Sequence, residues 1–462
     1  MSDAGSEVAA KPGRHREATL YRALDGDGAP AGLSLAEHRD AARALFEQLE
    51  LPVWRRSGFW TTSLAEIDLG AMRAHRGDAV PSIVTDTVGG LRRAGLIVQN
   101  GSATVHAEID PTLAARGVIL CSLERAASEH PELFARYYAK RLPYDRDKLS
   151  AGNGAFWSGG AFLYVPPDVQ IEAPFDIVYS LDRGHTAQYA RTLAIGDHHC
   201  ELRLREWDLA GDDLDGPCVH AGAFELYLED GARARLAHVQ DWNPRHPTPG
   251  HRGEVADVST HVVHVGRDAY CHWLPCILGG RLTRQHAELV ISEPGGDMAF
   301  RGLFFAERAE HLDLFAVDLH ETGPSGGDVH WRGAASGESR ASFEGLIKIN
   351  PGAQQSHTYL QIHTMMLSKA ARLDAIPSVL VSADDVSASH GGTVGELDED
   401  LIFYMRSRGL DRATAVRTIV EGFFEPLITE LQDPELEAIV RARVTARLEH
   451  AAGDIEAYVT AR

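Results

Sequence analysis

The chain is poor in cysteine and has no long apolar segment. Only five of its 462 residues are cysteines and no CxxC pair occurs, which argues against a disulfide framework, a zinc knuckle and a thioredoxin-type site. No run of about 18 apolar residues is present, so no transmembrane helix is expected. The sequence also lacks a GxxxxGK(S/T) loop and a GxGxxG turn after a strand, so the chain is not expected to hydrolyse ATP itself.

Positive charge is scarce as well. The chain has 45 Lys and Arg against 66 Asp and Glu, for a formal net charge of −21 with neutral histidines. Such an acidic surface repels phosphates and argues against nucleic-acid or anionic-membrane binding. A hydrophobic content of 44% excludes disorder for most of the chain. Residues 1–16 are polar without an apolar signal segment, so we expect a disordered tail and a cytoplasmic protein.

Residues 17–150 are expected to form an N-terminal helical domain. Ser34 is placed to cap a helix whose apolar residues begin at Leu35 and recur at near-helical spacing. Ser122 opens a second helix with an apolar stripe that reaches Tyr137. Proline and glycine interrupt the pattern between these helices, around a cluster of tryptophans at 54–60.

Residues 151–394 change to short alternating runs, which indicate strands with one buried face. Glycine-centred corners separate the runs, and the first three corners are about 30–35 residues apart, with no room for a long helix. This pattern favours a β-sandwich, a barrel or a β-solenoid, and periodicity alone leaves the three open. The clearest runs are Phe162–Val165, Phe224–Leu228, Ala287–Ile291 and Phe343–Ile349.

Residues 395–462 return to helical spacing. Asp398 and Asp411 are each placed to cap a helix, and the second helix carries a broad amphipathic stripe. Pro426 lies within that stripe and is expected to kink or end the helix. Asp433, followed directly by proline, predicts the start of a last helix. The expected layout is therefore a helical cap, a β body and a second helical cap.

Several segments resemble the SufB/SufD family of iron–sulfur cluster assembly proteins, with the C-terminal motif the most specific. The resemblance covers about residues 110–431 and is only loose in the N-terminal third. The segments that carry it are Ala155-Phe-Trp-Ser-Gly-Gly-Ala-Phe-Leu-Tyr-Val-Pro166, Ser382-Ala-Asp-Asp-Val-Ser-Ala-Ser-His-Gly-Gly-Thr-Val-Gly395, Leu397-Asp-Glu-Asp-Leu-Ile-Phe-Tyr-Met-Arg-Ser-Arg-Gly409 and Val420-Glu-Gly-Phe423, with weaker support from His130-Pro-Glu-Leu133 and Gln240-Asp-Trp242.

Within the family the chain is more similar to SufD than to SufB. The run Ala388-Ser-His-Gly391 resembles the SufD form. One common kind of SufB carries a cysteine near the last coil, where Ala371 stands here, and no cysteine lies between 277 and 462. An Arg-x-Asn pair of those SufB proteins aligns near Ser180 and Asp182. The resemblance thus implies that this chain lacks the thiol-based scaffold residues.

The resemblance implies a right-handed parallel β-helix between N- and C-terminal helical regions. It also implies a non-catalytic subunit of a SUF complex, which binds a SufB-like paralogue at the β-helix end and a SufC-like ATPase through its C-terminal helices. Any iron or iron–sulfur cluster would then be transient, and no permanent cofactor is expected. Two alternatives stay open: a SufB-like scaffold in its own right, and a stand-alone β-helix or cupin-like metal enzyme. The enzyme requires a tight set of two histidines and a carboxylate, for which no convincing sequence pattern exists. A homodimer through the same surface is a further alternative.

His390 is the candidate ligand for iron or a nascent cluster, because the resemblance implies that it lies at the SufB–SufD interface. Imidazole is a suitable iron ligand. Three nearby carboxylates, of Asp384, Asp385 and Glu396, are candidates for orienting it. The alternative for these acidic residues, solvated loop side chains, is the more favoured reading.

The candidate ATPase-docking surface follows the C-terminal motif and the amphipathic stripe at 413–431. We expect part of this segment to pack against the β body and the arginines to lie on the exposed side, where they can pair with partner carboxylates. The candidates are Phe403, Tyr404, Arg406, Arg408, Phe423 and Phe424.

Cysteine and histidine pairs in the β region are interpreted as core rather than metal ligands. His198-His-Cys200 and Cys218-Val-His220 each place the two residue types two apart, which on a strand gives one shared face. Cys271 and Cys276 are five apart and are expected on opposite faces. Free cysteine is more often a buried core residue than a ligand. Gln240 and Trp242 are likewise expected to pack inside the body, with the indole N–H hydrogen-bonded.

Overall fold

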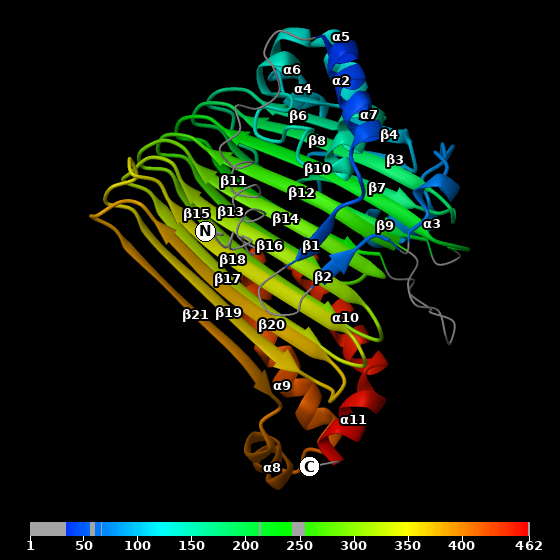
Figure 1. Cartoon of the computed structure of the whole chain (residues 1–462), viewed down its shortest axis with the longest axis vertical. Coiled ribbons are helices and arrows are strands. Elements are labelled where there is room, and N and C mark those ends of the chain that lie inside the picture. The colour runs from blue at the N-terminus through cyan, green and yellow to red at the C-terminus, as the bar shows by residue number, and fades with distance from the viewer. Residues whose placement is uncertain (1–33, 56–60, 66, 212–213, 243–254, 461–462) are drawn as a thin grey trace, which may run out of the picture.

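Two long, mostly parallel sheets form the body of the protein, with the N-terminal helices at one end and the C-terminal helices along one side (Figure 1). The computed structural model describes residues 34–55, 61–65, 67–211, 214–242 and 255–460. The first sheet has nine strands in the order β20-β18-β16-β14-β12-β10-β8-β6-β5, and the second has ten in the order β21-β19-β17-β15-β13-β11-β9-β7-β3-β4. Successive strands therefore alternate between the two sheets, which is the arrangement of a parallel β-helix. Among the described helices, none has both the length and the apolar character needed to cross a bilayer.

The strands of the first sheet include all four runs that the sequence predicted. Its strands are β5 (Ile119–Cys121), β6 (Ala161–Val165), β8 (Ala187–Gly196), β10 (Cys218–Leu228), β12 (Val255–Val265), β14 (Leu282–Ile291), β16 (His311–His320), β18 (Arg340–Ile349) and β20 (Arg372–Val381).

The second sheet supplies the other strand of each coil. Its strands are β3 (Gly95–Asn100), β4 (Ala103–Ile109), β7 (Phe175–Leu181), β9 (Glu201–Ala210), β11 (Arg233–Asp241), β13 (Tyr270–Ile277), β15 (Asp297–Ala306), β17 (Gly326–Ala335), β19 (His357–Met366) and β21 (Ser387–Glu396). The β-helix that the resemblance implies is thus confirmed, and the sandwich and barrel alternatives are wrong.

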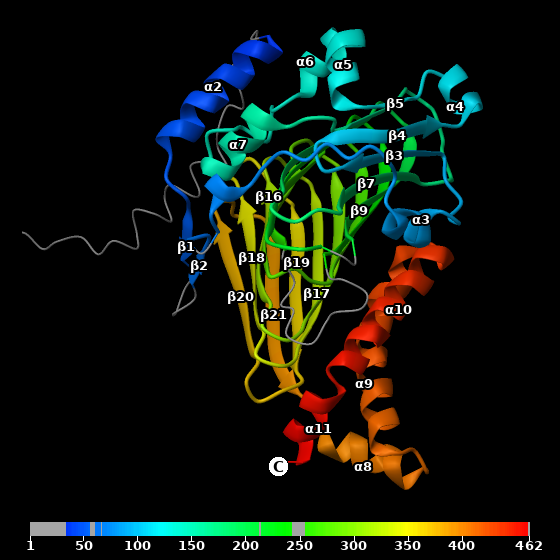
Figure 2. The ribbon, with the colours of Figure 1, turned by 90° about the vertical axis from the view of Figure 1, so that its right-hand side faces the viewer.

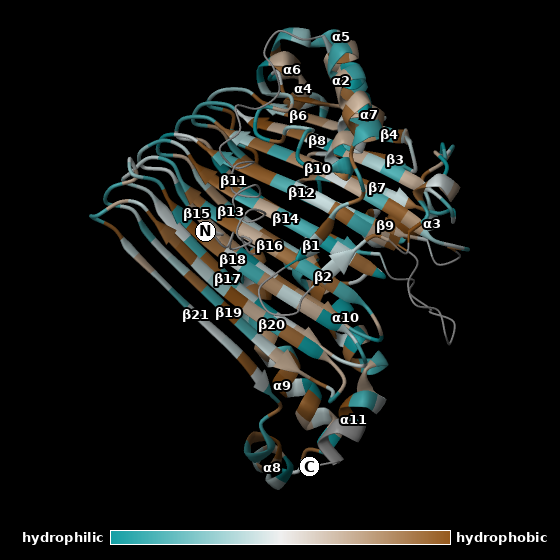
Figure 3. Cartoon of the chain, in the orientation of Figure 1, coloured by the Kyte–Doolittle hydropathy of each residue, from teal (hydrophilic) through white to brown (hydrophobic). Residues whose placement is uncertain are grey.

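The main hydrophobic core lies between the two sheets. Alternate residues of each strand point inward and stack on the equivalent residues of the neighbouring coils, as Leu236, Trp273 and Phe300 do in the second sheet. Bands of hydrophobic and hydrophilic colour alternate along the strands in Figure 3. Because each coil covers the core of the previous one, the inner strands are buried almost throughout.

Corners with a left-handed residue turn the chain from the first sheet to the second. His199, Gly231, Asp268 and Gly295 occupy equivalent corners with φ of 56°, 68°, 52° and 79°. The backbone N–H of each donates to a carbonyl of the next corner, from His199 to Asp230 and from Gly231 to Arg267, for example. A Cβ on Gly231 would lie 2.2 Å from His199 Nδ1, so stacking and positive φ together explain the glycine corners.

The N-terminal region differs from the predicted helical domain, because it contributes strands as well as helices. Its described helices are α2 (Leu35–Gln48), α3 (Ser82–Val88), α4 (Pro111–Ala115), α5 (Leu123–Glu129), α6 (Pro131–Tyr137) and α7 (Lys148–Phe156), with a short 3₁₀ helix at Leu69–Ala71. A small antiparallel pair, β1 (Val53–Arg55) and β2 (Thr61–Ser63), follows α2.

Strand pairing explains that difference. β3 joins the second sheet beside β7, and β5 joins the first beside β6, so this region closes the upper end of the β-helix. The caps predicted at Ser34 and Ser122 are present. The predicted helix from Ser122 to Tyr137 is divided at His130, because Pro131 starts a new helix. The expected tail, residues 1–16, and Trp60 of the predicted cluster lie outside the described residues.

The C-terminal helices return along the outer face of the second sheet (Figure 2). They are α8 (Glu399–Ser407), α9 (Arg412–Ile428), α10 (Pro434–His450) and α11 (Ala452–Thr460), with a 3₁₀ turn at Thr429–Leu431. Asp398, Asp411 and Asp433 cap the first three, as predicted. Pro426 lies in the last turn of α9, and the helix ends two residues later. The chain thus has the expected layout, with α7 spanning the predicted boundary at 150.

Candidate functional site

His390 lies on β21, the last strand of the second sheet. β21 pairs only with β19, where His390 is in register with Leu360. Leu360 belongs to the core between the sheets, so His390 lies on the inward face of the last coil. No further coil covers this position, and His390 is exposed. The candidate ligand therefore sits at the open end of the β-helix.

The three candidate carboxylates do not surround His390 in the isolated chain. Asp384 and Asp385 lie in the corner before β21, where the Asp385 backbone is held by Gln354 and Gln355. Glu396 is the last residue of β21, six residues beyond His390, which corresponds to about 20 Å along a strand. Extended backbone thus separates each carboxylate from the imidazole, and the solvated-loop interpretation fits the exposed Asp384 and Asp385.

The open end also exposes apolar side chains and unpaired strand edges. β20 and β21 are the last strands of their sheets, so each has one edge without a neighbouring strand. β21 is mostly pale in the hydropathy view, whereas the inner strands carry strong hydrophobic bands (Figure 3). An exposed apolar strand edge is a template for pairing with another chain. The exposed apolar residues are Tyr359, Val379, Leu380, Val381 and Val394.

The α8 surface presents two aromatic rings to solvent. Phe403 is 72% exposed and Tyr404 54% exposed. Arg408 is held against Tyr404, with its guanidinium 5.2 Å from the ring centroid and Nη2 3.2 Å from the hydroxyl. Arg406 is also exposed. These four candidates are called the α8 surface. They lie close together because residues three to four apart are neighbours on a helix.

Phe423 and Phe424 belong to the core of the C-terminal helices instead. Phe424 is fully buried, with its ring centroid 6.1 Å from that of Phe305 in β15. Phe423 is half-buried, and the Arg332 guanidinium lies 5.3 Å from its ring centroid. The amphipathic stripe of α9 therefore packs on the sheet. Phe424 cannot offer its side chain to a partner in this conformation, which corrects the prediction for that residue.

All five cysteines are buried and none of them forms a disulfide with another, as the core interpretation expects. Cys271 lies in the core between the sheets, whereas Cys276 packs under the C-terminal helices, so the two point to opposite faces as predicted. Burial raises the pKa of the Cys121 thiol to about 11 and that of Cys200 to about 12. These thiols are therefore protonated near neutral pH. His198 and His199 lie in a corner, so the expected shared strand face does not form there.

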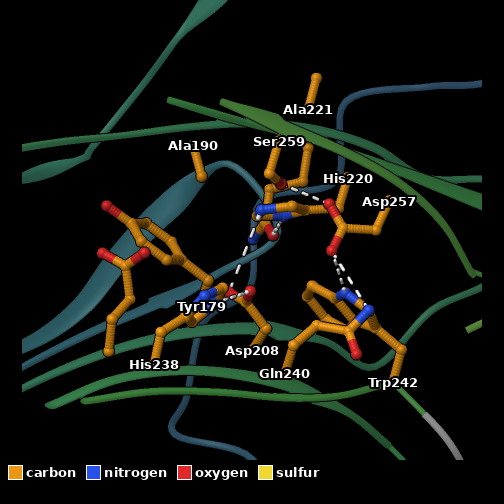
Figure 4. Close-up of polar contacts among 12 residues, drawn as sticks. Tyr179, Ala190, Asp208, His220, Ala221, His238, Gln240, Trp242, Asp257 and Ser259 are labelled. Atoms are coloured by element: carbon orange, nitrogen blue, oxygen red, sulfur yellow. Dashed lines mark hydrogen bonds and ion pairs between the residues drawn. The ribbon is translucent and has the colours of Figure 1, made fainter. Parts of the chain in front are cut away.

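A row of polar side chains crosses the β-helix interior (Figure 4). Trp242 is fully buried and its Nε1 donates to Asp257 Oδ2 at 3.2 Å. Gln240 donates through Nε2 to Thr283 Oγ1 and to the Gly279 carbonyl, each at 2.8 Å. Both residues pack inside the body, as predicted. Their partner Asp257 also accepts from the hydroxyl of Ser259.

Deeper in this row, Glu206, His238 and His261 converge from three strands. One ligand-type atom of each lies within 4.8 Å of the others. His261 Nε2 is 3.7 Å from Glu206 Oε1, and His238 Nε2 is 2.7 Å from Asp208 Oδ2. Thr192 Oγ1 donates to Glu206 Oε2 at 2.7 Å. The three residues are at most 4% exposed.

Opposing effects set the charges of this cluster. Burial raises the pKa of Glu206, but the hydrogen bond with His261 and the charge of His238 outweigh it and lower the pKa. Burial lowers the pKa of His261 below its ordinary value. Burial also acts to lower the pKa of His238, but the neighbouring Asp208 carboxylate has the larger effect and raises it. The cluster thus combines an ionised carboxylate with a neutral imidazole, both competent metal ligands.

The sequence reasoning did not single out this cluster. Its members lie 32 and 23 residues apart, so no local spacing motif joins them. The signal that could have found them is polar residues at every second position of a predicted strand, as in Glu206-x-Asp208 and His238-x-Gln240. In a β-helix such residues of successive coils stack in one interior row.

Comparison with protein families gives matches over most of the chain. The family model for the SUF system FeS cluster assembly SufBD core domain matches residues 179–423, which include β8 to β21 and most of α9. The model for the SufBD protein N-terminal region matches residues 31–177. The two matches are consecutive along the chain and leave residues 1–30 and 424–462 outside.

Curated relatives agree with these matches. A protein of Staphylococcus epidermidis, described as an iron–sulfur cluster assembly SufBD family protein, is 25% identical over 338 residues. The alignment covers 73% of this chain and 70% of the relative. Proteins of Staphylococcus aureus and Staphylococcus haemolyticus with the same description show the same identity and coverage.

Proposed function

The chain belongs to the SufBD family of iron–sulfur cluster assembly proteins, and from this we propose that it acts as the SufD-like subunit of a SUF complex. In this role it pairs with a SufB-like paralogue through the open end of the β-helix. It binds a SufC-like ATPase through its C-terminal helices and has no catalytic activity of its own. It supports cluster formation and iron acquisition by the complex.

The observation that carries this proposal is the open last coil with His390 on its inward face. Parallel β-helices usually cover their terminal coils, because an exposed edge promotes unwanted pairing. Among the described residues, β21 has no neighbouring strand along its outer edge, and apolar Val379 and Val394 are 40% and 46% exposed. A related β-helix is a suitable partner, because its own terminal coil can add strands to both sheets.

The SufD-like role rests on the residues that the chain lacks. A SufB-like scaffold that nucleates a cluster through thiolate needs a reactive cysteine near the final coils, and Ala371 stands at that position. The five cysteines present are all buried. His390 can supply one imidazole to an iron or cluster held between the two paralogues. We therefore favour the role of contributing subunit over that of independent scaffold.

The α8 surface supports the ATPase-docking part of the proposal. Phe403 and Tyr404 are large aromatic residues that the fold leaves in solvent, and such residues are common binding hot spots. Nearby, α9, α10 and α11 border a groove of about 270 Å³, lined by apolar Val416, Leu448 and Ile455. Together these features offer a partner an aromatic anchor beside an apolar cleft.

The test is to co-express the chain with a SufB-like paralogue and a SufC-like ATPase from the same source. We expect all three to co-purify, and we expect His390→Ala to keep the complex but reduce its iron and sulfide, measured anaerobically, by about tenfold or more. The exposed corner residue His198 provides the matched control, His198→Ala, which should leave iron and sulfide unchanged.

Two outcomes would contradict the proposal. If neither partner co-purifies, the assembly-subunit role is wrong. If the complex forms and His390→Ala retains full iron and sulfide, His390 is structural and the chemical part of the proposal fails.

A further inference from the structure

The strongest unassigned feature is the group formed by Glu206, His238 and His261 in the β-helix interior. It lies within the body, whereas His390 lies on the last strand, β21. It belongs to the chain alone and needs no partner subunit, so it goes beyond the proposed function. Two histidines and one carboxylate within 4.8 Å of one another are the donor set typical of transition-metal sites.

The strand register brings these three residues together. Glu206 of β9 pairs directly with His238 of β11 in the second sheet, so their backbones are about 4.8 Å apart. His261 comes from β12 of the first sheet, across the interior. In the first sheet Phe224 pairs with both His261 and Thr192, so Thr192 lies two coils from His261 in the same row. The backbone therefore fixes the positions of all three side chains.

Neighbouring side chains orient two of the three. His238 Nε2 is 2.7 Å from Asp208 Oδ2, and its Nδ1 has no hydrogen-bond partner among the described residues. Metal-bound histidines commonly donate their other ring N–H to a carboxylate, which fixes the tautomer and leaves the second nitrogen for the metal. Glu206 is held through one oxygen by Thr192, 2.7 Å away, and Thr192 is held in turn by Tyr179 at 2.7 Å.

The charge around the group favours a cation. Glu206 and Asp208 are at most 4% exposed, and Asp208 Oδ1 also lacks a hydrogen-bond partner within the described chain. The ion pairs that the structure gives for these two carboxylates all involve histidines, without lysine or arginine. Burying two carboxylates side by side is unfavourable unless nearby positive charge compensates them, which a bound cation supplies.

We propose that the β-helix interior binds one divalent transition-metal ion through Glu206, His238 and His261. Asp208 acts as a positioning residue that orients His238. Nitrogen and carboxylate donors favour iron(II), zinc or cobalt(II) over magnesium and calcium, which prefer all-oxygen sites. Ligands lie about 2.1 Å from such an ion, so binding draws the three side chains somewhat closer together. Because the group is buried, the ion enters while the chain folds or opens locally.

The experiment loads the full chain during expression, in medium supplemented with iron, zinc or cobalt alone. The metal content of the purified protein is measured by mass spectrometry, and the cobalt form is examined by visible spectroscopy. We expect about one ion per chain and visible ligand-field bands in the cobalt form that the metal-free protein lacks.

Single substitutions then identify the ligands. Glu206→Gln and His261→Gln are expected to reduce the bound metal at least about tenfold, and Asp208→Asn to weaken metal retention about tenfold or more against a chelator. His320→Asn is the matched control, since His320 is also a buried interior histidine paired with an aspartate, Asp318, but lies in another coil. This control should keep the full metal content.

Several outcomes overturn the proposal. Wild-type protein without stoichiometric metal in any of the three media rejects it, whatever the variants do. Full metal content in folded Glu206→Gln and His261→Gln rejects the assigned ligands. If circular dichroism shows that those variants do not fold, X-ray absorption of the wild-type cobalt form provides the test. A spectrum with fewer than two imidazole ligands would contradict the proposed site. None of these results depends on SUF partners.

Discussion

Arg205 and Asp176 form a buried two-point ion pair, with Nε 2.7 Å from Oδ1 and Nη2 2.9 Å from Oδ2. The same guanidinium reaches the N-cap residue of α10, Asp433, at 3.1 Å. Trp207 Nε1 also donates to Asp176, at 2.9 Å from Oδ1. The pair thus joins two β-helix coils to the C-terminal helices, which carry the α8 surface.

We expect Arg205→Met to destabilise the protein by about 3–5 kcal/mol, because it removes the two-point partner of the buried Asp176 carboxylate and leaves only the Arg93 guanidinium, 3.9 Å away, to balance its charge. The free energy of unfolding in urea measures this effect. Arg267→Met is the matched control: its partner Glu293 is 3.1 Å away, but both side chains are about half exposed. An exposed pair contributes only about 0–1 kcal/mol. Equal losses in the two variants would show that burial of the Arg205 pair has no special role.

The open end of the β-helix gives a second prediction. Val394 on β21 is 46% exposed, and a lysine there would put an unpaired charge at the strand edge, where it blocks pairing. We expect Val394→Lys to reduce co-purification of the SufB-like paralogue by about tenfold or more, with an unchanged melting temperature. Val53→Lys serves as control, since Val53 is 42% exposed on β1, in the small two-stranded sheet. Normal pairing in Val394→Lys would place the partner surface elsewhere.

Buried histidines give a pH prediction. Burial lowers the pKa of His264 to about 3 and that of His286 to about 4, against about 6.5 for an exposed histidine. Between these values the unfolded chain binds protons that the folded chain does not. Stability is therefore complete above about pH 6.5 and falls on acidification, by up to about 1.4 kcal/mol per pH unit for each histidine.

The measurement is urea unfolding at several pH values from 7 to 4.5. His264→Gln keeps an acceptor for the Ser292 hydroxyl, which lies 2.7 Å from His264 Nε2, but cannot titrate. We expect this variant to show a shallower loss of stability on acidification than the wild type. His198→Gln is the control, because an exposed side chain is solvated in both states. An unchanged slope in His264→Gln would mean that this histidine titrates equally in the folded and unfolded chain.

The sequence indicated one strand of each coil better than the other. The four predicted runs, such as Phe224–Leu228 and Phe343–Ile349, all lie in the first sheet. The second sheet is covered on its outer face by α9 and α10, so strands such as β9 carry apolar residues outward as well as inward. In the second half of β9 the usual pattern is reversed, because Trp207 and Leu209 pack with the helices. Glu206 instead lies on the same inward face as the core residues Leu202 and Leu204. Alternation alone cannot assign the faces of such a strand.

Helix boundaries were predictable where a side-chain cap decides them, at the aspartate and serine caps, whereas the break at Pro131 was missed because the apolar stripe continues across it. The N-terminal strands were not, because β3 and β5 are strands through pairing with β7 and β6, which is a tertiary effect. The interior histidines were missed for the same reason. His238 and His261 meet only after two sheets have formed, so the set of two histidines and a carboxylate that the sequence search sought exists only in the folded chain.

Phe403 and Phe424 allow the docking and packing roles of the C-terminal segment to be separated. Phe403 is 72% exposed on α8, whereas Phe424 is fully buried against Phe305. We expect Phe403→Ser to leave the free energy of unfolding within about 0.5 kcal/mol of wild type but to reduce co-purification of the SufC-like ATPase about tenfold or more. Phe424→Ala should cost about 3–5 kcal/mol of stability, because it opens a cavity in the core. Urea unfolding and pull-down of the ATPase measure the two effects on the same samples. Normal ATPase binding by Phe403→Ser would show that the α8 surface is not part of the docking site.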